Sequence, residues 1–241
     1  MEVLAIAGVR IEHIVKSYML ENKKVDVLCD LNFEIDSDGI TVIIGKSGCG
    51  KTTFLRIVSG LEKPDSGQII FEKKEKIGMV FQEGRLMPWL NCRKNISFGL
   101  NKKTFNKNYI DSLIDMVGLN GFDEAYPNQL SGGMQQRAAL ARALAYNPSL
   151  ILMDEPFAAL DFFTRDTMQN ELLRIQAASQ KGIIFVTHNI DEALLLGHKI
   201  VVFEGGEMKK QYDLSSYGYG RDLLSQSMLK IKKDILNTMK N

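Results

Sequence analysis

Eight consecutive residues near position 50 have the types and spacing of a phosphate-binding loop. They are Gly45, Lys46, Ser47, Gly48, Cys49, Gly50, Lys51 and Thr52, and they fit the pattern G-x-x-x-x-G-K-[ST]. The glycines let the backbone curl so that successive N–H groups can point at phosphate oxygens. Lys51 can then reach the β- and γ-phosphates, and the Thr52 hydroxyl can ligate Mg²⁺. The segment therefore predicts binding of a nucleoside triphosphate together with magnesium.

A pair of carboxylates follows an apolar run later in the chain. Residues 150–153 are apolar, and Asp154 and Glu155 come directly after them. If the run is a strand, both carboxylates lie at its C-terminal edge, beside the phosphates. Asp154 can then hold the magnesium shell, and Glu155 can orient and deprotonate the attacking water. The pair predicts hydrolysis of the bound nucleotide.

A second candidate anion site lies between these two motifs. Ser131, Gly132 and Gly133 open a predicted helix, so unpaired N–H groups and a hydroxyl face outward there. The loop at residues 45–52 already binds the chain's own phosphates. A second phosphate site in the same chain therefore implies a second copy.

The string around this site, LSGGMQQR at residues 130–137, resembles the signature of the ATP-binding subunits of ATP-binding cassette (ABC) transporters. The resemblance covers residues 9–210. It implies that two cassettes sandwich two ATP molecules, with each phosphate-binding loop facing the signature of the partner. It also places Gln135 of the signature and Thr53, after the phosphate loop, among the nucleotide-binding residues.

The same resemblance assigns roles to four further residues, which follow in the family's order. Gln82 matches the glutamine that contacts Mg²⁺ and water and leads into a helical subdomain. Asp161 matches the residue of a loop that crosses the dimer interface. His188 matches the switch histidine at the γ-phosphate, and Tyr18 matches the aromatic residue that stacks on adenine.

Two strings point to one branch of the family. FQEGRLMPWL at residues 81–90 and LDFFTR at residues 160–165 are similar to the ATPases of nitrate, sulfonate and taurine importers. This resemblance implies that ATP hydrolysis powers uptake of a small solute through a separate membrane permease, with a solute-binding protein taking part indirectly. The partner ATPase is an identical copy or a homologue.

Two alternatives are open for Trp89. Its loop contacts a permease helix, or Trp89 packs inside the helical subdomain.

A non-transport ABC ATPase, of the DNA-repair or translation type, is the alternative function. Such chains usually carry long coiled coils, zinc modules or two cassettes, and the sequence has none of these. The 241 residues include 30 Lys and Arg against 29 Asp and Glu, a formal charge of +1, which is not the footprint of a nucleic-acid-binding protein. No nucleic-acid partner is therefore expected.

Composition also bounds the location. Hydrophobic residues make up 45% of the chain, as in ordinary globular proteins, but the apolar runs are strand-sized and too short to span a membrane. The three cysteines, Cys29, Cys49 and Cys92, are odd in number and widely spaced, which fits free thiols in a reducing compartment. We expect a peripheral protein on the cytoplasmic side of the cell membrane.

The elements that must position these residues are those of an α/β fold. We expect a P-loop NTPase core with a mixed, mainly parallel sheet, an antiparallel β N-terminal part and an inserted α-helical subdomain. Strands are predicted at residues 1–10, 31–35, 40–44, 68–71, 77–81, 150–153, 182–187 and 199–203. Helices are predicted at 53–59, 109–117, 133–146, 164–178, 191–196 and from residue 221 onward.

The predicted division of the chain is a single nucleotide-binding domain with three parts. Residues 1–82 and 148–210 form the ATP-binding core, 83–147 the helical subdomain, and 211–241 a C-terminal helical extension. The last helix carries an apolar stripe of Leu224, Met228, Ile231, Ile235 and Met239. That stripe is expected to pack on the domain, with binding to a membrane surface as the alternative.

Overall fold

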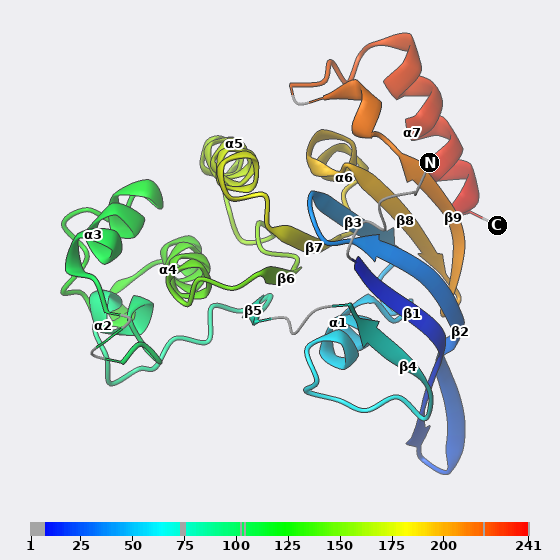
Figure 1. Ribbon diagram of the computed structural model, residues 1–241, viewed down its shortest axis with the longest axis horizontal. Helices are drawn as coiled ribbons and strands as arrows, with labels where there is room; N and C mark the ends of the chain where they lie inside the picture. The colour runs from blue at the N-terminus through cyan, green and yellow to red at the C-terminus, as the bar shows by residue number, and fades with distance from the viewer. Residues whose placement is uncertain (1–7, 73–75, 102, 104, 219, 241) are drawn as a thin grey trace. The chain divides into compact units, whose positions relative to one another are not determined.

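The computed structural model describes residues 8–240 except 73–75, 102, 104 and 219. Two compact units divide the chain: Met1–Glu75 with Ser179–Asn241, and Lys76–Ala178 (Figure 1). Each unit contains strands and helices of its own. Of the strand predicted at residues 1–10, residues 1–7 lie outside the described residues, and residues 8–10 are the start of strand β1 (Gly8–Leu20).

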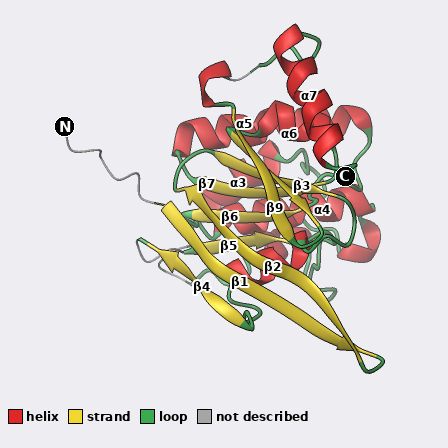
Figure 2. Ribbon diagram, turned by 90° about the vertical axis from the view of Figure 1, so that its right-hand side faces the viewer, coloured by secondary structure: helices red, strands yellow, loops and turns green. Residues whose placement is uncertain are grey.

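The first unit contains an antiparallel sheet made from β1 (Gly8–Leu20), β2 (Lys23–Asp36) and β4 (Ser66–Phe71), in the order β2-β1-β4 (Figure 2). Alternate residues of β2 are buried, as the two-residue period of Leu31, Phe33 and Ile35 predicts. Glu21 and Asn22 connect β1 to β2 with φ angles of 46° and 65°, the geometry of a tight hairpin turn.

A second sheet in the same unit is mainly parallel. β7 (Gly182–Thr187), β3 (Ile40–Gly45) and β8 (Lys199–Glu204) run in parallel, and β9 (Glu207–Asp213) pairs antiparallel with β8. Every residue of β3 and β7 is buried, because both faces of a parallel sheet are covered. The helices of this unit are α1 (Lys51–Val58), α6 (Ile190–Leu196) and α7 (Gln226–Thr238).

Three aromatic rings join the two sheets of the first unit through α1. Phe33 on β2, Phe54 on α1 and Phe203 on β8 have ring centroids 5.5 to 5.9 Å apart. Phe54 and Phe203 have no exposed surface. Such tilted and edge-on ring pairs are favourable contacts in protein cores, so the helix after the phosphate-binding loop is anchored to both sheets.

The second unit combines two parallel strands with helices. β5 (Ile77–Val80) pairs with β6 (Leu150–Asp154). The helices are α2 (Cys92–Ile96), α3 (Lys107–Met116), α4 (Gly132–Ala145) and α5 (Phe162–Ser179), with a short 3₁₀ turn at Pro127–Gln129. α4 contacts α2, α3 and β5, and its alanines allow this close packing. α4 is therefore the central helix of this unit (Figure 1).

The predicted fold class is confirmed: the sheet that contains β3 and β7 is mixed and mainly parallel, the N-terminal part is antiparallel, and a helical segment lies between strands. None of the helices that the structure describes is long and apolar enough to cross a membrane. Cys29, Cys49 and Cys92 are free thiols, as expected.

The C-terminal part was predicted wrongly in two respects. Residues 211–213 belong to β9, and the last helix begins at Gln226 instead of Arg221, because the Ser225 hydroxyl caps the helix by accepting from the Met228 N–H. Leu224 therefore precedes the helix and is exposed, whereas Met228 and Ile235 are buried. Those two residues pack on the domain, as expected.

Candidate functional site

The phosphate-binding loop connects β3 to α1 and requires glycine at particular positions. A Cβ on Gly45 would lie 2.4 Å from the Phe203 carbonyl oxygen and 2.5 Å from the Cys49 Sγ, so no larger residue fits. Gly48 and Gly50 have φ angles of +82° and +97°, which L-residues with side chains rarely adopt. The loop is thus tightly wound against β8, with Lys46, Ser47 and Gly48 exposed.

Lys51 lies inside this loop. Its side chain is 5% exposed, and its Nζ donates to the carbonyl oxygens of Gly45 and Lys46, both at 2.8 Å. Within the described chain, no side chain caps α1 and no acidic residue occupies its first turn. The Lys51 ammonium and the positive end of the helix therefore lie together, an electropositive arrangement that fits a bound triphosphate.

His188 lies at the same edge of the parallel sheet as this loop. β3 and β7 pair with Ile44 opposite Thr187. The phosphate-binding loop starts one residue after Ile44, and His188 comes one residue after Thr187. The Thr187 hydroxyl donates to Glu192 at 2.6 Å, and the Asn189 side chain accepts the N–H groups of Asp191 and Glu192. These bonds hold the backbone on both sides of the exposed His188.

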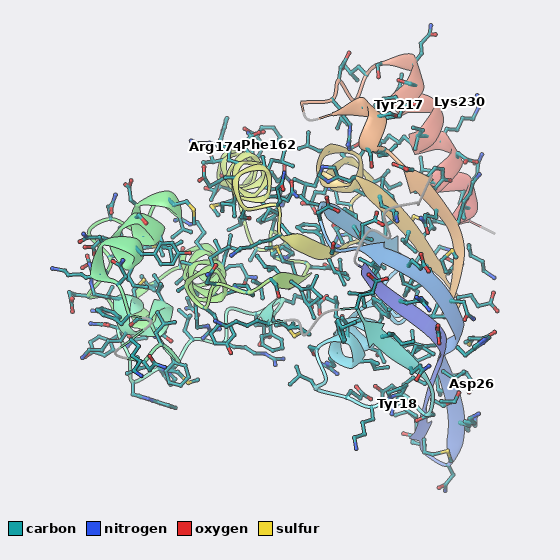
Figure 3. The ribbon with its side chains drawn as sticks, in the orientation of Figure 1. Tyr18, Asp26, Phe162, Arg174, Tyr217 and Lys230 are labelled. Atoms are coloured by element: carbon teal, nitrogen blue, oxygen red, sulfur yellow. The ribbon has the colours of Figure 1, made fainter. Side chains whose placement is uncertain are left out.

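Tyr18 lies beside α1, in the same unit. Its hydroxyl donates to Glu62 at 2.5 Å, and the Lys16 Nζ lies 5.4 Å from its ring centroid. Burial and the Glu62 carboxylate raise the pKa of Tyr18, while a hydrogen bond with the Thr53 side chain opposes that shift. Figure 3 labels Tyr18 on its strand. The structure therefore brings Tyr18 close to Thr53, immediately after the phosphate-binding loop.

The second unit brings three further predicted site residues to one strand edge. Val80 pairs with Met153, so Gln82 and the Asp154–Glu155 pair follow adjacent strand ends. Asp154 is buried, and Glu155 has a φ of +45°. Non-glycine residues in this left-handed region are uncommon and gather at functional sites.

The helix with the serine-glycine start is capped by the serine. Ser131 precedes α4, and its hydroxyl accepts from the Met134 N–H at 3.3 Å. Ser131 and Gly132 are exposed. The Gln135 side chain donates to the carbonyl oxygens of Pro127 and Leu130, at 2.9 and 3.2 Å. Gln135 thus braces the loop that leads into the helix.

Asp161 lies close to this helix start. A Cβ on Gly133 would lie 3.1 Å from the Leu160 side chain, one residue before Asp161. The Asp161 carboxylate accepts the N–H of Thr164 at 3.0 Å, and hydrogen bonds from the Thr164 side chain and backbone lower the pKa of Asp161. Asp161 therefore caps α5 on the same side as the signature.

Two residues that the sequence analysis missed connect α4 to the segment after β5. The Gln136 side chain donates to the Phe81 carbonyl oxygen at 2.8 Å. The Arg142 guanidinium donates to the carbonyl oxygens of Gly84 and Arg85, both at 2.9 Å. Burial lowers the pKa of Arg142. A charged residue inside an alanine-rich, packed helix needs such partners. The presence of Arg142 in this helix is therefore the sequence signal that could have predicted the contact.

Trp89 is 70% exposed, which excludes one of its two alternatives, packing inside the helical subdomain. The side chain of Asn95, which is fully buried, binds the backbone of the loop that carries Trp89. The Asn95 amide accepts from the Met87 N–H and donates to the carbonyl oxygens of Met87, Leu90 and Asn91 at 2.8 to 3.1 Å. The loop therefore presents the tryptophan on a firmly bonded base.

Each unit thus holds a defined set of the predicted site residues. The first unit contains the phosphate-binding loop, Tyr18 and His188. The second unit contains Gln82, the Asp154–Glu155 pair, the signature helix and Asp161. All of these residues belong to loops at strand ends or helix starts, except Tyr18, which lies within β1.

Comparisons with known proteins agree on one family. The family model described as ABC transporter matches residues 28–158. An uncharacterized ABC transporter ATP-binding protein of Methanocaldococcus jannaschii is 43% identical, over 96% of this chain and 91% of the relative. The aliphatic sulfonates import ATP-binding protein SsuB of Bacillus thuringiensis is 40% identical, over 95% and 94% of the two chains. The taurine import ATP-binding protein TauB of Roseobacter denitrificans is 40% identical, over 90% and 86%.

Solved structures agree with this assignment. A dimeric ATP-binding cassette in a post-hydrolysis state, bound to ADP and Pi, matches with a TM-score of 0.78 and 31% identity. The match covers 86% of this chain and 98% of the solved one.

Proposed function

Since the chain belongs to the ABC transporter family, as the ATP-hydrolysing subunit of an importer, we propose that two copies of it close on two ATP molecules. One observation carries this proposal: a single chain holds both the Lys51 loop and a separate capped helix start at Ser131. Each is an anion site, and one triphosphate fills the first. The Ser131 site of one copy therefore binds the γ-phosphate held by Lys51 of the other.

The phosphate-binding loop and Tyr18 of the first unit bind the nucleotide. The N–H groups of residues 45–52 and the Lys51 ammonium bind the phosphates, and the Tyr18 ring stacks on adenine. Thr52, Gln82 and Asp154 offer the oxygen ligands that Mg²⁺ prefers, and the ion neutralises charge on the phosphates when bound. We propose magnesium as the cofactor on the basis of this donor set.

Hydrolysis uses residues from both copies. Glu155 orients the attacking water and takes its proton, while His188 contacts the γ-phosphate. The Ser131 hydroxyl and the Gly133 N–H of the second copy donate to the γ-phosphate oxygens. They stabilise the negative charge there as water bonds to the γ-phosphorus and the bond to the departing ADP breaks. Asp161 crosses the interface between the copies.

Transport requires a membrane permease, which we propose as the partner at the cytoplasmic face of the membrane. The exposed Trp89 on its Asn95-braced loop suits contact with a permease helix. The relatives SsuB and TauB are named for aliphatic sulfonates and taurine. We therefore propose a small sulfonate as the transported solute, delivered to the permease by a solute-binding protein.

The proposed division of the chain remains a core of residues 1–82 and 148–210 with a helical subdomain at 83–147.

Glu155→Gln tests the hydrolytic assignment, because it keeps the side-chain shape and removes the base. ATP turnover should fall by about 10²-fold or more, the usual contribution of a general base, while ATP binding persists. Sedimentation with ATP should show the variant as a dimer. Unchanged turnover would show that Glu155 is not the general base. Taurine-stimulated turnover of the complex with permease and binding protein, reconstituted in vesicles, tests the proposed solute.

A further inference from the structure

We propose that Glu62 is a positioning residue for the adenine base, because its carboxylate fixes the Tyr18 ring, an inference that rests on the proposed binding of ATP. The Tyr18 hydroxyl donates to a Glu62 carboxylate oxygen at 2.5 Å. The Glu62 side chain is 19% exposed, so this bond is largely shielded from water. Hydrogen bonds to an ionised acceptor are about twice as strong as those between neutral groups. The bond therefore holds the phenol ring in one orientation.

Strand pairing alone does not set the direction of this ring. The pairing of β1 with β2 shifts its register between Ile14 and Lys16, and again between Lys16 and Ser17, directly before Tyr18 (Figure 3). Irregular pairing of this kind bends a strand and changes the direction of its side chains. The Tyr18 side chain therefore needs a support from outside β1.

The loop that carries Glu62 is fastened to this same part of β1. The Asp65 carboxylate accepts the Ser17 N–H at 2.7 Å. The Asp65 N–H donates to the Val15 carbonyl oxygen at 2.8 Å. Glu62 thus reaches the tyrosine hydroxyl from a fixed backbone, and the ring is oriented before a nucleotide binds. Preorganisation of this kind lowers the entropic cost of stacking a base on the ring.

The Lys16 ammonium contacts both members of this pair. It lies 5.4 Å from the Tyr18 ring centroid and 3.5 Å from the Glu62 carboxylate. A hydrogen bond to the Lys63 carbonyl oxygen, at 2.9 Å, holds it there. The ammonium offsets the charge of the carboxylate, which would otherwise repel a triphosphate, and it occupies one face of the ring. Adenine stacks on the opposite face.

Thr53 connects the ring to the phosphate-binding site. Its side chain makes a hydrogen bond with the Tyr18 hydroxyl, and it lies in the first turn of α1, two residues after Lys51. The hydroxyl is thus held between the Glu62 carboxylate and the helix whose start binds the phosphates. Glu62 itself contacts the ring and not the phosphate-binding loop. Its loss should therefore weaken the contact with the base and spare the contact with the phosphates.

The test compares ADP with inorganic pyrophosphate, which carries two phosphates and lacks the base. Both are titrated in the presence of magnesium by isothermal calorimetry. In Glu62→Ala the dissociation constant of ADP should rise about fivefold or more, as for loss of one hydrogen bond, and that of pyrophosphate should not change. Glu62→Gln keeps an acceptor oxygen at the same place and should recover most of the affinity for ADP. Glu12→Ala is the matched control: the Glu12 carboxylate, on β1, accepts from the Gln68 side chain at 3.0 Å, and its loss should change neither constant.

A double-mutant cycle shows whether Glu62 acts through the tyrosine hydroxyl. Tyr18→Phe keeps the ring and removes the hydroxyl, so it should weaken ADP binding as Glu62→Ala does. The two changes combined should weaken ADP binding no further than either change alone, because both remove the same bond. Tyr18→Phe leaves the carboxylate in place, so this arm decides the question even if Glu62→Ala fails to fold.

Three results overturn the positioning role of Glu62 and leave the proposed function intact. They are equal weakening of ADP and pyrophosphate binding in Glu62→Ala, unchanged ADP binding in that variant, and additive effects in the cycle. Unchanged ADP binding in Tyr18→Ala removes Tyr18 from the base site, and this inference with it. An unsubstituted chain that binds neither ADP nor pyrophosphate overturns the proposed function itself.

Discussion

Ile44 and Thr187 lie opposite each other in two parallel strands, β3 and β7. The phosphate-binding loop begins immediately after Ile44, and His188 follows Thr187. The pairing register therefore sets the distance along the sheet edge between the phosphate site and the histidine. A shift of one residue would place His188 on the other face of the strand. Every residue of both strands is buried, which makes this register difficult to change.

Gly45→Ala should abolish ATP binding. The added Cβ would lie 2.4 Å from the Phe203 carbonyl oxygen and 2.5 Å from the Cys49 Sγ, so the loop must shift. Overpacking of this kind costs about 1–3 kcal/mol of stability. We expect ATP to stabilise the unsubstituted protein in thermal melts, and this shift should disappear in the variant. Gly60→Ala is the control, because Gly60 lies outside the phosphate-binding loop, nothing lies within 4 Å of its Cβ position, and only its φ of +74° opposes the change. A full ATP shift for Gly45→Ala would contradict the prediction.

Arg142→Lys should separate coupling from nucleotide binding. A lysine cannot donate to the Gly84 and Arg85 carbonyl oxygens with a planar fork, so the segment after Gln82 loses part of its attachment to α4. In the assembled transporter we expect kcat to fall several-fold, by about 1 kcal/mol in the barrier, with the KM for ATP unchanged. Arg174→Lys, at an exposed ion pair with Glu171, should have no effect. A raised KM with unchanged kcat would assign Arg142 to nucleotide binding instead.

Trp89→Ala should leave the isolated subunit stable and active. The side chain is mostly exposed, so the free energy of unfolding should change by less than about 0.5 kcal/mol. Co-purification with the permease should be lost or strongly reduced. Asn95→Ala provides the contrast, because it removes a buried amide with several bonds and should cost about 2 kcal/mol or more in chemical denaturation. Unimpaired permease assembly of Trp89→Ala would exclude this loop as the docking surface.

Cys92 should make stability depend on alkaline pH. Burial raises the pKa of its thiol to about 11. The pKa of Cys92 is higher in the folded protein than in the unfolded chain. The contribution of the protonated thiol to the free energy of unfolding is therefore fully present below about pH 8.5 and is lost as pH rises toward 11. The loss should reach about 2–3 kcal/mol at pH 11 relative to pH 8. Urea denaturation of the protein and of Cys92→Ala measures it: the difference between them should shrink over this range. A constant difference would show that the thiol titrates normally.

Much of the fold and most of the site could be predicted from local pattern. The apolar run before Asp154 predicts its strand, and the glycines and Lys51 predict the loop after β3. The residues carried over by family resemblance, such as His188, lie at strand ends, as Ile44 and Thr187 show. These features depend on short stretches of sequence, where residue type and spacing suffice.

The missed features depend on contacts between distant residues. The bonds from Gln136 to Phe81 and from Arg142 to Gly84 join residues more than 50 positions apart. β9 was missed because an edge strand has little apolar alternation, although Gly205-Gly206 between it and β8 is a typical hairpin signal. The late start of α7 depends on which serine caps it.

The ring cluster of Phe33, Phe54 and Phe203 has a genetic consequence. Phe54 is three residues from Lys51, and its ring contacts both other rings. A cavity-forming change such as Phe54→Ala costs about 3–5 kcal/mol, and it loosens the helix whose first turn we propose as the phosphate site. Cells that depend on this importer for growth would therefore score such an allele as a transport mutant, although the altered residue touches neither nucleotide nor permease.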